Sequence, residues 1–297
     1  MHPKTPRVLN RDDLIASYFT LAGAGVGNAA RFSFAERIAA AAAAGFSGVG
    51  MLVDDYTACR AAGLSDADMR AILDDHGIQV AELEFLFDWS RGDERATFAR
   101  RVEDQLYAIA DAFGARHMNV GDINPAGEQA PLALVAERFA ALCDRAAAHG
   151  LLVAIEFLPW TDIPDARTAW EIARLAGRRN GGLLVDAWHY FRGTTDADQL
   201  RAVPADRFIS VQLDDADAER IGESYEDTLR RRLPGEGTFD LVALIRLLDD
   251  IGVRAPLSIE IISPEHHARP LEEAARLAHD TTRRVLQVAR QARTPVA

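Results

Sequence analysis

Apolar residues recur along the chain in two alternating patterns. The first is a set of short, nearly continuous apolar runs, which are typical of strands buried on both faces of a parallel sheet. These runs predict strands at 14–20, 47–53, 79–86, 116–121, 151–157, 182–187, 208–213 and 256–262. The second is a set of longer stretches with helical periodicity, which predict helices at 34–45, 66–76, 93–114, 130–149, 165–177, 238–251 and about 270–292. At most a brief helix, at 196–202, separates the sixth strand from the seventh.

Residues with a preference for helix ends support these boundaries. Ser33 precedes one predicted helix with Glu36 three positions on, Ser65 precedes the next, and Thr238 precedes the seventh. Glycines stand where five helices should stop, at Gly77, Gly114, Gly150, Gly177 and Gly252.

The alternation predicts a single (β/α)8 TIM barrel over residues 1–297. Eight strand–helix units follow one another without a linker rich in Pro, Gly or Ser, and alternating units of this kind form a parallel sheet. Residues 1–12 would be an N-terminal extension and 214–237 a lid loop over the barrel mouth. The alternative is an open, doubly wound sheet. The glycines of 22–28 have the spacing GxGxG, however, which is not the dinucleotide-binding spacing GxGxxG.

Composition narrows the function classes. Asp and Glu total 45 against 33 Lys and Arg, a formal charge of −12, and this acid excess disfavours a nucleic-acid partner. No uncharged apolar run reaches about 18 residues, so no membrane span is expected. The N-terminus lacks an apolar leader, and Cys59 and Cys143 are too few for a disulfide framework. We therefore expect a cytoplasmic protein.

Polar residues stand at the ends of four successive predicted strands. Glu156, Asp186, Gln212 and Glu260 are each directly preceded by Ile or Val. A buried acid is costly unless it is paired or bound to a metal, and strand ends meet at the carboxyl face of a barrel. Three carboxylates and an amide oxygen suit one divalent ion, with Mn²⁺ or Mg²⁺ favoured and Co²⁺ or Zn²⁺ as alternatives.

The competing interpretation of these acids is structural. Buried carboxylates also occur as partners of arginine, and Arg192, Arg231 or Arg232 could form a salt-bridge network with them. The residue pattern leaves both interpretations open.

The sequence resembles the xylose isomerase-like barrel superfamily, in particular its sugar phosphate isomerase/epimerase branch. Glu156, Asp186 with His189, Gln212 and Glu260 match in order and spacing the Glu, Asp-x-x-His, His or Gln, and Glu of that superfamily. The segment 231–237, RRLPGEG, resembles its Arg-x-x-Pro-Gly loop, which implies that Arg231 contacts a substrate oxygen. Two departures separate the branches. Ketose epimerases mostly carry His where Gln212 stands, and a Gln there is similar to the dehydratase branch. Those dehydratases, however, usually carry His at the position of Leu158.

The resemblance implies a metal-dependent isomerase or epimerase of carbohydrate metabolism. Such an enzyme acts through an enediolate on a small sugar-like or polyol-like hydroxy-ketone. Glu156 and Glu260 would remove and return the proton. His189 would either donate to a substrate oxygen or orient Asp186. Trp188 and Trp160 could wall the substrate or pack in the upper barrel, and Glu84 could bind a substrate hydroxyl or cap a neighbouring helix.

Three other functions remain as alternatives. A lyase resembling 3-dehydroshikimate or inosose dehydratases would use the same enolate chemistry and expel water. Endonuclease IV-like DNA repair is remote, because eight His and a charge of −12 suit neither a multi-zinc centre nor DNA. A non-catalytic binding barrel is the last. The expected partner is a small polyol or keto-sugar, and a homo-oligomer stays open.

Overall fold

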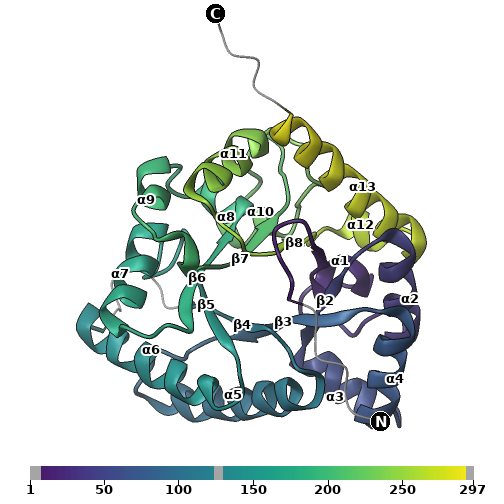
Figure 1. The fold of residues 1–297 in the computed structure, drawn as a ribbon, viewed down its shortest axis with the longest axis horizontal. Coiled ribbons are helices and arrows are strands. Elements are labelled where there is room, and N and C mark those ends of the chain that lie inside the picture. Colours follow the sequence, from purple (N-terminus) through teal and green to yellow (C-terminus); the bar gives the residue numbers. More distant parts are fainter. Residues whose placement is uncertain (1–7, 124–129, 292–297) are drawn as a thin grey trace, which may run out of the picture.

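Eight parallel strands form a closed barrel in the computed structural model, which describes residues 8–123 and 130–291 (Figure 1). Each strand pairs with the next in sequence, and the last closes on the first through Leu14 opposite Leu257. The strands are β1 (Leu14–Ala16), β2 (Gly48–Leu52), β3 (Gln79–Leu86), β4 (His117–Val120), β5 (Leu152–Glu156), β6 (Gly181–Asp186), β7 (Phe208–Leu213) and β8 (Leu257–Ile259). The predicted (β/α)8 barrel is confirmed, and the open-sheet alternative is wrong.

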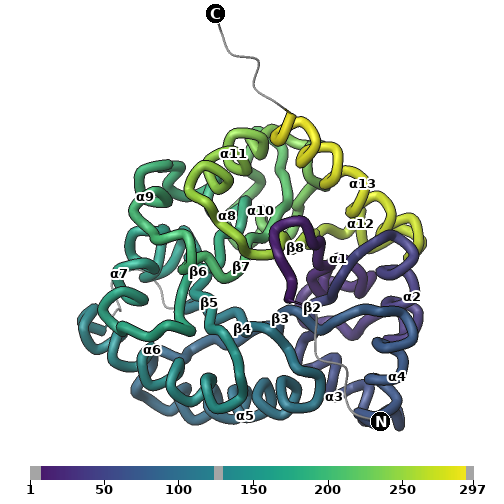
Figure 2. Tube along the Cα trace, viewed as in Figure 1, coloured from purple at the N-terminus to yellow at the C-terminus, as the bar shows by residue number. Residues whose placement is uncertain are grey.

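Helices surround the barrel as an outer ring, which the trace in Figure 2 follows from the N-terminal to the C-terminal end. They are α1 (Tyr18–Ala22), α2 (Phe34–Ala44), α3 (Val53–Ala61), α4 (Asp66–His76), α5 (Glu94–Phe113), α6 (Leu132–Ala147), α7 (Ala166–Ala176), α8 (Ala187–Arg192), α9 (Ala197–Arg201), α10 (Ser224–Thr228), α11 (Leu241–Ile251), α12 (Pro264–His267) and α13 (Leu271–Arg290), with a 3-10 turn at Ala205–Arg207. Among the described residues, no helix combines the length and apolarity needed to cross a membrane.

The predicted helix caps are present with two exceptions. Gly150 does not cap α6, which ends at Ala147 with Ala148 as its C-cap. The Ser33 side chain accepts from the Glu36 backbone N–H, and the Glu36 carboxylate accepts in return from the Ser33 N–H at 2.8 Å. Thr238 is not the cap of α11. Asp240 caps that helix by accepting from the Ala243 N–H at 2.9 Å, because its carboxylate reaches the first turn.

Two further differences concern the ends of strands. The strand expected at 14–20 stops at Ala16, and residues 18–22 form α1, a helix too short to show its periodicity in the sequence. The strand expected at 47–53 ends at Leu52, and the unpredicted helix α3 follows at once. Both changes turn the chain outward at the carboxyl face of the barrel.

The barrel interior changes from apolar to polar along its axis. Its amino-terminal end is filled by two small apolar clusters: Leu9, Ile15 and Ala81, and Ala154, Leu184 and Ile209. The main apolar core lies outside the strands, where they pack against the helices. Because this outer layer supplies most of the apolar burial, the carboxyl-terminal half of the interior can hold polar side chains.

Candidate active site

Four polar side chains from neighbouring strands lie buried at the carboxyl end of the barrel. Glu156 ends β5, Asp186 ends β6, Gln212 lies in β7 and Glu260 directly follows β8. Their exposed fractions are 5, 0, 2 and 8% respectively. Burial of three ionisable carboxyls in one place demands a positive partner.

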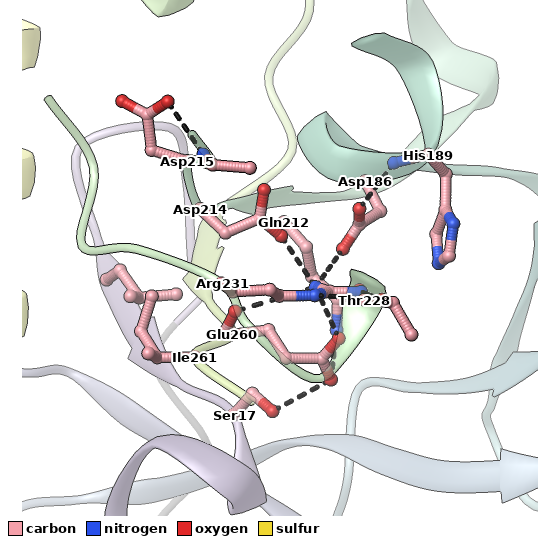
Figure 3. A network of polar contacts seen from close by, with 12 residues as sticks. Ser17, Asp186, His189, Gln212, Asp214, Asp215, Thr228, Arg231, Glu260 and Ile261 are labelled. Carbon is pink, nitrogen blue, oxygen red and sulfur yellow. Dashed lines mark hydrogen bonds and ion pairs between the residues drawn. The ribbon is translucent and has the colours of Figure 1, made fainter. Parts of the chain in front are cut away.

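The guanidinium of Arg231 supplies part of that positive charge (Figure 3). Its Nη1 donates to Asp186 Oδ2 at 2.7 Å, to Asp214 Oδ2 at 2.5 Å and to Glu260 Oε2 at 2.9 Å. Its Nε and Nη2 donate to Thr228 Oγ1 at 3.3 and 3.1 Å. The salt-bridge interpretation is therefore partly realised, through Arg231 alone of the three arginines considered.

The segment 214–237 carries Arg231 to this position and is fixed at both of its ends. Asp215 accepts from the N–H groups of Gly235 and Phe239, at 3.0 and 2.9 Å. Within the segment, Asp227 forms a buried ion pair with Arg192 at 2.8 Å. These contacts hold the segment predicted as a lid loop against the barrel mouth.

A second group lies beside the first. Ligand atoms of Glu156, Asp186 and His189 all lie within 4.8 Å of one another, a spacing that can hold a metal ion. Asp186 is the N-cap of α8: its Oδ1 accepts from the His189 backbone N–H at 3.0 Å, which fixes the carboxylate at the strand end. The His189 ring Nε2 approaches Glu156 Oε1 to 3.4 Å, but that oxygen accepts no hydrogen bond.

Unpaired polar atoms around this point suit a divalent ion. Glu156 Oε1, His189 Nδ1, Gln212 Oε1 and Asp214 Oδ1 are buried without a hydrogen-bond partner. Arg231 contacts the carboxyl groups of Asp186, Asp214 and Glu260, and the Glu156 carboxyl adds a fourth acid to its electrostatic surroundings. Carboxylate, amide oxygen and imidazole ligands fit Mn²⁺, Mg²⁺, Co²⁺ or Zn²⁺, so the residues present match the expected ion.

Burial and mutual repulsion shift the pKa values of these groups. Burial, with Asp186 and Glu260 nearby, raises the pKa of Glu156 well above its usual range. Burial raises the pKa of Glu260 to about 7 although Arg231 opposes it. For Asp186, burial is outweighed by Arg231 and His189, which lower its pKa. Burial lowers the pKa of His189 to about 3, so its ring is neutral at pH 7.

The other expected substrate contacts fall into two places. Trp160, Trp188 and His189 form one aromatic group, with ring centroids 5.2–5.9 Å apart. Glu84 is 2% exposed and lies in β3, remote in sequence from this group. Its position inside the strand removes the alternative that Glu84 caps a helix.

Three residues of the cluster were not identified from the sequence. Asp214 stands beside Asp215 in a charged stretch that reads as a solvated face, and Thr228 lies in the same stretch. Ser17, whose hydroxyl donates to Glu260 Oε1 at 3.1 Å, falls in the middle of the mispredicted first strand. For Asp214, the continued two-residue alternation after Gln212 was the available signal.

Known proteins with similar sequences are enzymes. The chain is 28% identical over 240 residues to a 3-dehydroshikimate dehydratase of Pseudomonas aeruginosa, which covers 79% of this chain and 37% of the dehydratase. It is 29% identical over 143 residues to an inosose isomerase of Bacillus subtilis, which covers 48% of this chain and 51% of the isomerase. The chain thus spans between about a third and a half of the length of these curated relatives.

Structural similarity extends over nearly the whole chain. The solved structure of the IOLI protein with a bound zinc atom superimposes with a TM-score of 0.82 at 20% identity, covering 94% of this chain and all of that protein. The family model described as xylose isomerase-like TIM barrel matches residues 38–285. The resemblance found in the strand-end residues is thereby confirmed, and the chain belongs to the xylose isomerase-like TIM barrel family.

Proposed function

We propose that the chain is a divalent-metal-dependent isomerase or epimerase of small sugar-like or polyol-like hydroxy-ketones. The observation that carries the proposal is the meeting of Glu156, Asp186 and His189 within 4.8 Å, with the Glu260 carboxyl in the same buried cluster. Buried acids with raised pKa values at a barrel mouth are what proton transfer requires. Similarity to an inosose isomerase adds support.

Glu156, Asp186, Gln212 and Glu260 would hold the ion, Mn²⁺ or Mg²⁺ before Co²⁺ or Zn²⁺. Once bound, the ion supplies positive charge next to the substrate's carbonyl oxygen. The zinc atom bound by the IOLI protein supports a metal in a barrel of this fold without deciding which ion. His189 joins the set through its ring, which is neutral at pH 7 and so able to ligate.

Proton transfer falls to the two glutamates. Glu156 on β5 and Glu260 after β8 leave the barrel from separate strands, so they can address the substrate carbon from different sides. One carboxylate oxygen would take the proton next to the carbonyl, and the other carboxyl would return it. The pKa of Glu260, about 7, suits either role near neutral pH.

The remaining predicted residues bind and enclose the substrate. Arg231 would donate to a substrate oxygen from its place among the carboxylates, and Trp188, Trp160 and Glu84 would line the site. Residues 214–237 would act as the lid of the site. The whole chain would form one domain. The part of the N-terminal extension at 1–7 lies outside the described residues.

Product analysis in deuterated water tests the proposal. The Mn²⁺-loaded protein is incubated with inosose and with 3-dehydroshikimate, and the products are followed by NMR and mass spectrometry. We expect deuterium to be incorporated into the ketone without loss of water. In Glu156→Gln and Glu260→Gln we expect no deuterium incorporation. A chain that binds no divalent ion, or whose ion has no effect on exchange, would contradict the proposal.

Dehydration is the second candidate. Gln212 and the similarity to 3-dehydroshikimate dehydratase over 79% of the chain favour it, whereas Leu158 disfavours it. One of the two glutamates would then remove the proton next to the carbonyl, and the other carboxyl would protonate the β-hydroxyl, which leaves as water. Release of water from 3-dehydroshikimate in the assay above would select this candidate.

A further inference from the structure

Two polar side chains inside the barrel lack partners and lie outside the metal cluster. Both oxygens of Glu84 and both amide atoms of Asn119 are buried without a hydrogen bond. Their side chains are 2 and 0% exposed. Burial, together with Glu82 and Glu260, raises the pKa of Glu84 well above its usual range. Neither Glu82 nor the Ser17 hydroxyl stands in hydrogen-bonding geometry with it.

Contacts across the barrel show that these side chains face its interior. The Ser258 hydroxyl of β8 donates to Glu82 Oε1 of β3 at 2.6 Å, although these strands are not neighbours. Glu82 is also paired in register with His117 on β4. Because strand residues alternate between faces, Glu84 and Asn119 face inward as well, one step nearer the carboxyl end.

The chain leaves room for the Glu84 carboxyl. Gly50 on β2 has no side chain, and a Cβ there would stand 2.7 Å from Glu84 Oε1 and 3.1 Å from Glu82 Oε1. Buried polar atoms without partners cost stability, so their persistence indicates a role outside folding.

We propose that Glu84 and Asn119 form a subsite for adjacent hydroxyl groups of the substrate, which selects an uncharged polyhydroxy ketone over a ketone carrying a carboxylate. An amide offers one donor and one acceptor face, and a carboxyl group beside it complements a second hydroxyl. This inference rests on the proposed function and names the substrate class of the same site.

Charge in the barrel interior supports this selection. Among the described residues, six buried acids meet there: Glu82, Glu84, Glu156, Asp186, Asp214 and Glu260. Arg231 already donates to three of them, and burial lowers the pKa of His117, which keeps its ring neutral. Burial and the neighbouring Glu82 and Glu260 raise the pKa of Glu84 well above its usual range, which shows that this place disfavours a further negative charge. The other nearby cation, Arg116, donates to the Ile209 carbonyl at 2.7 Å. A substrate carboxylate beside Glu84 would therefore be disfavoured, whereas hydroxyl groups find donors and acceptors.

Calorimetric titration of the Mn²⁺-loaded protein tests the subsite. The probes are inosose, an uncharged cyclic polyol ketone, and 3-dehydroshikimate, a ring ketone with a carboxylate. We expect wild type to bind inosose at least about tenfold more tightly. Asn119→Leu and Glu84→Met should each weaken inosose binding about five- to tenfold, the loss of one hydrogen bond. Glu84→Gln, which keeps hydrogen-bonding groups, should lose less, and Glu171→Gln on the exposed face of α7 serves as the unchanged control.

Thermal stability provides a second readout, which also shows that the variants fold. Apolar replacements remove unsatisfied buried groups, so Asn119→Leu and Glu84→Met should melt no lower than wild type; a purely structural role would make them melt lower. The inference would be overturned if both variants bound inosose as tightly as wild type does. It would also be overturned if wild type bound 3-dehydroshikimate as tightly as inosose or more tightly, or bound neither ketone. If the variants lose inosose binding but wild type exchanges no deuterium, the subsite is supported and the proposed reaction is rejected.

Discussion

Replacement of Arg231 by methionine tests how far the buried cluster depends on one cation. The side chain is 2% exposed and donates to Asp186, Asp214 and Glu260. Removing one partner of a buried ion pair costs about 3–5 kcal/mol, because the remaining charges stay buried and unpaired. For domains somewhat smaller than this one, each kcal/mol of lost stability lowers the melting temperature by about 2–4 °C. The melting temperature of metal-free Arg231→Met should therefore fall by about 6–20 °C.

Added Mn²⁺ should recover more stability in the variant than in wild type. In wild type the proposed ion would share Asp186 and Glu260 with Arg231, whereas in the variant both carboxylates would be free to bind it. An ion present at a hundredfold excess over its Kd contributes about 2.7 kcal/mol, or about 5–11 °C. Scanning calorimetry with EDTA and then with Mn²⁺ measures both shifts.

Arg232→Met is the matched control, since it changes the adjacent arginine. Arg232 is 40% exposed and pairs with Asp217 and Glu265 at the surface, where an ion pair contributes about 0–1 kcal/mol. Melting temperatures of the two variants within about 2 °C of each other would refute the reasoning, because the buried carboxylates would then need no counter-ion.

Three further predictions concern the same site. Mn²⁺ affinity, measured by electron paramagnetic resonance, should fall as the pH drops below about 7, because protonated Glu260 is no ligand; a flat profile from pH 6 to 8 would contradict this. His189→Gln should leave unchanged the pH at which Mn²⁺ affinity falls, since a ring with a pKa of about 3 does not titrate near pH 7. A change of that pH by a full unit would argue against a neutral His189. Asp214→Asn should change Mn²⁺ affinity only a few-fold, because Asp214 is outside the predicted ligand set. It should raise the KM for the ketone, because Arg231 loses one of its carboxylate partners. Equal KM values in variant and wild type would show that Asp214 does not position Arg231.

The barrel was predictable because strands buried on both faces read as apolar runs. The apolar run at 151–157 shows this, because the strand in the structure is Leu152–Glu156 and ends with the acid Glu156. The mistaken strand at 14–20 failed for the opposite reason: five helical residues in α1 are fewer than two turns, too few to show a helical period. Local pattern therefore identifies long elements and misplaces the short ones that shape the mouth.

Contacts within the site depended on information that spacing does not hold. Asp186 and Glu260 were identified as strand-end acids, but Arg231 reaches them from 45 and 29 residues away. It does so from a segment whose only helix is the short α10, which ends three residues before Arg231. The resemblance assigned Arg231 to the substrate and could not indicate three carboxylate partners. Only the folded path of 214–237 brings the guanidinium among them.

The acids of β3 carried a signal that was visible in the sequence. In QVAELEFL, Glu82 and Glu84 are two residues apart within an apolar run, so both must face the same side of the strand. The helix-facing side is apolar, because Leu83, which stands between the two acids, lies in the main core; the two acids therefore face the barrel interior. A barrel that is stabilised from outside its strands can accept such acids within, and this separation allows the carboxyl half of the interior to be shaped by substrate chemistry instead of packing.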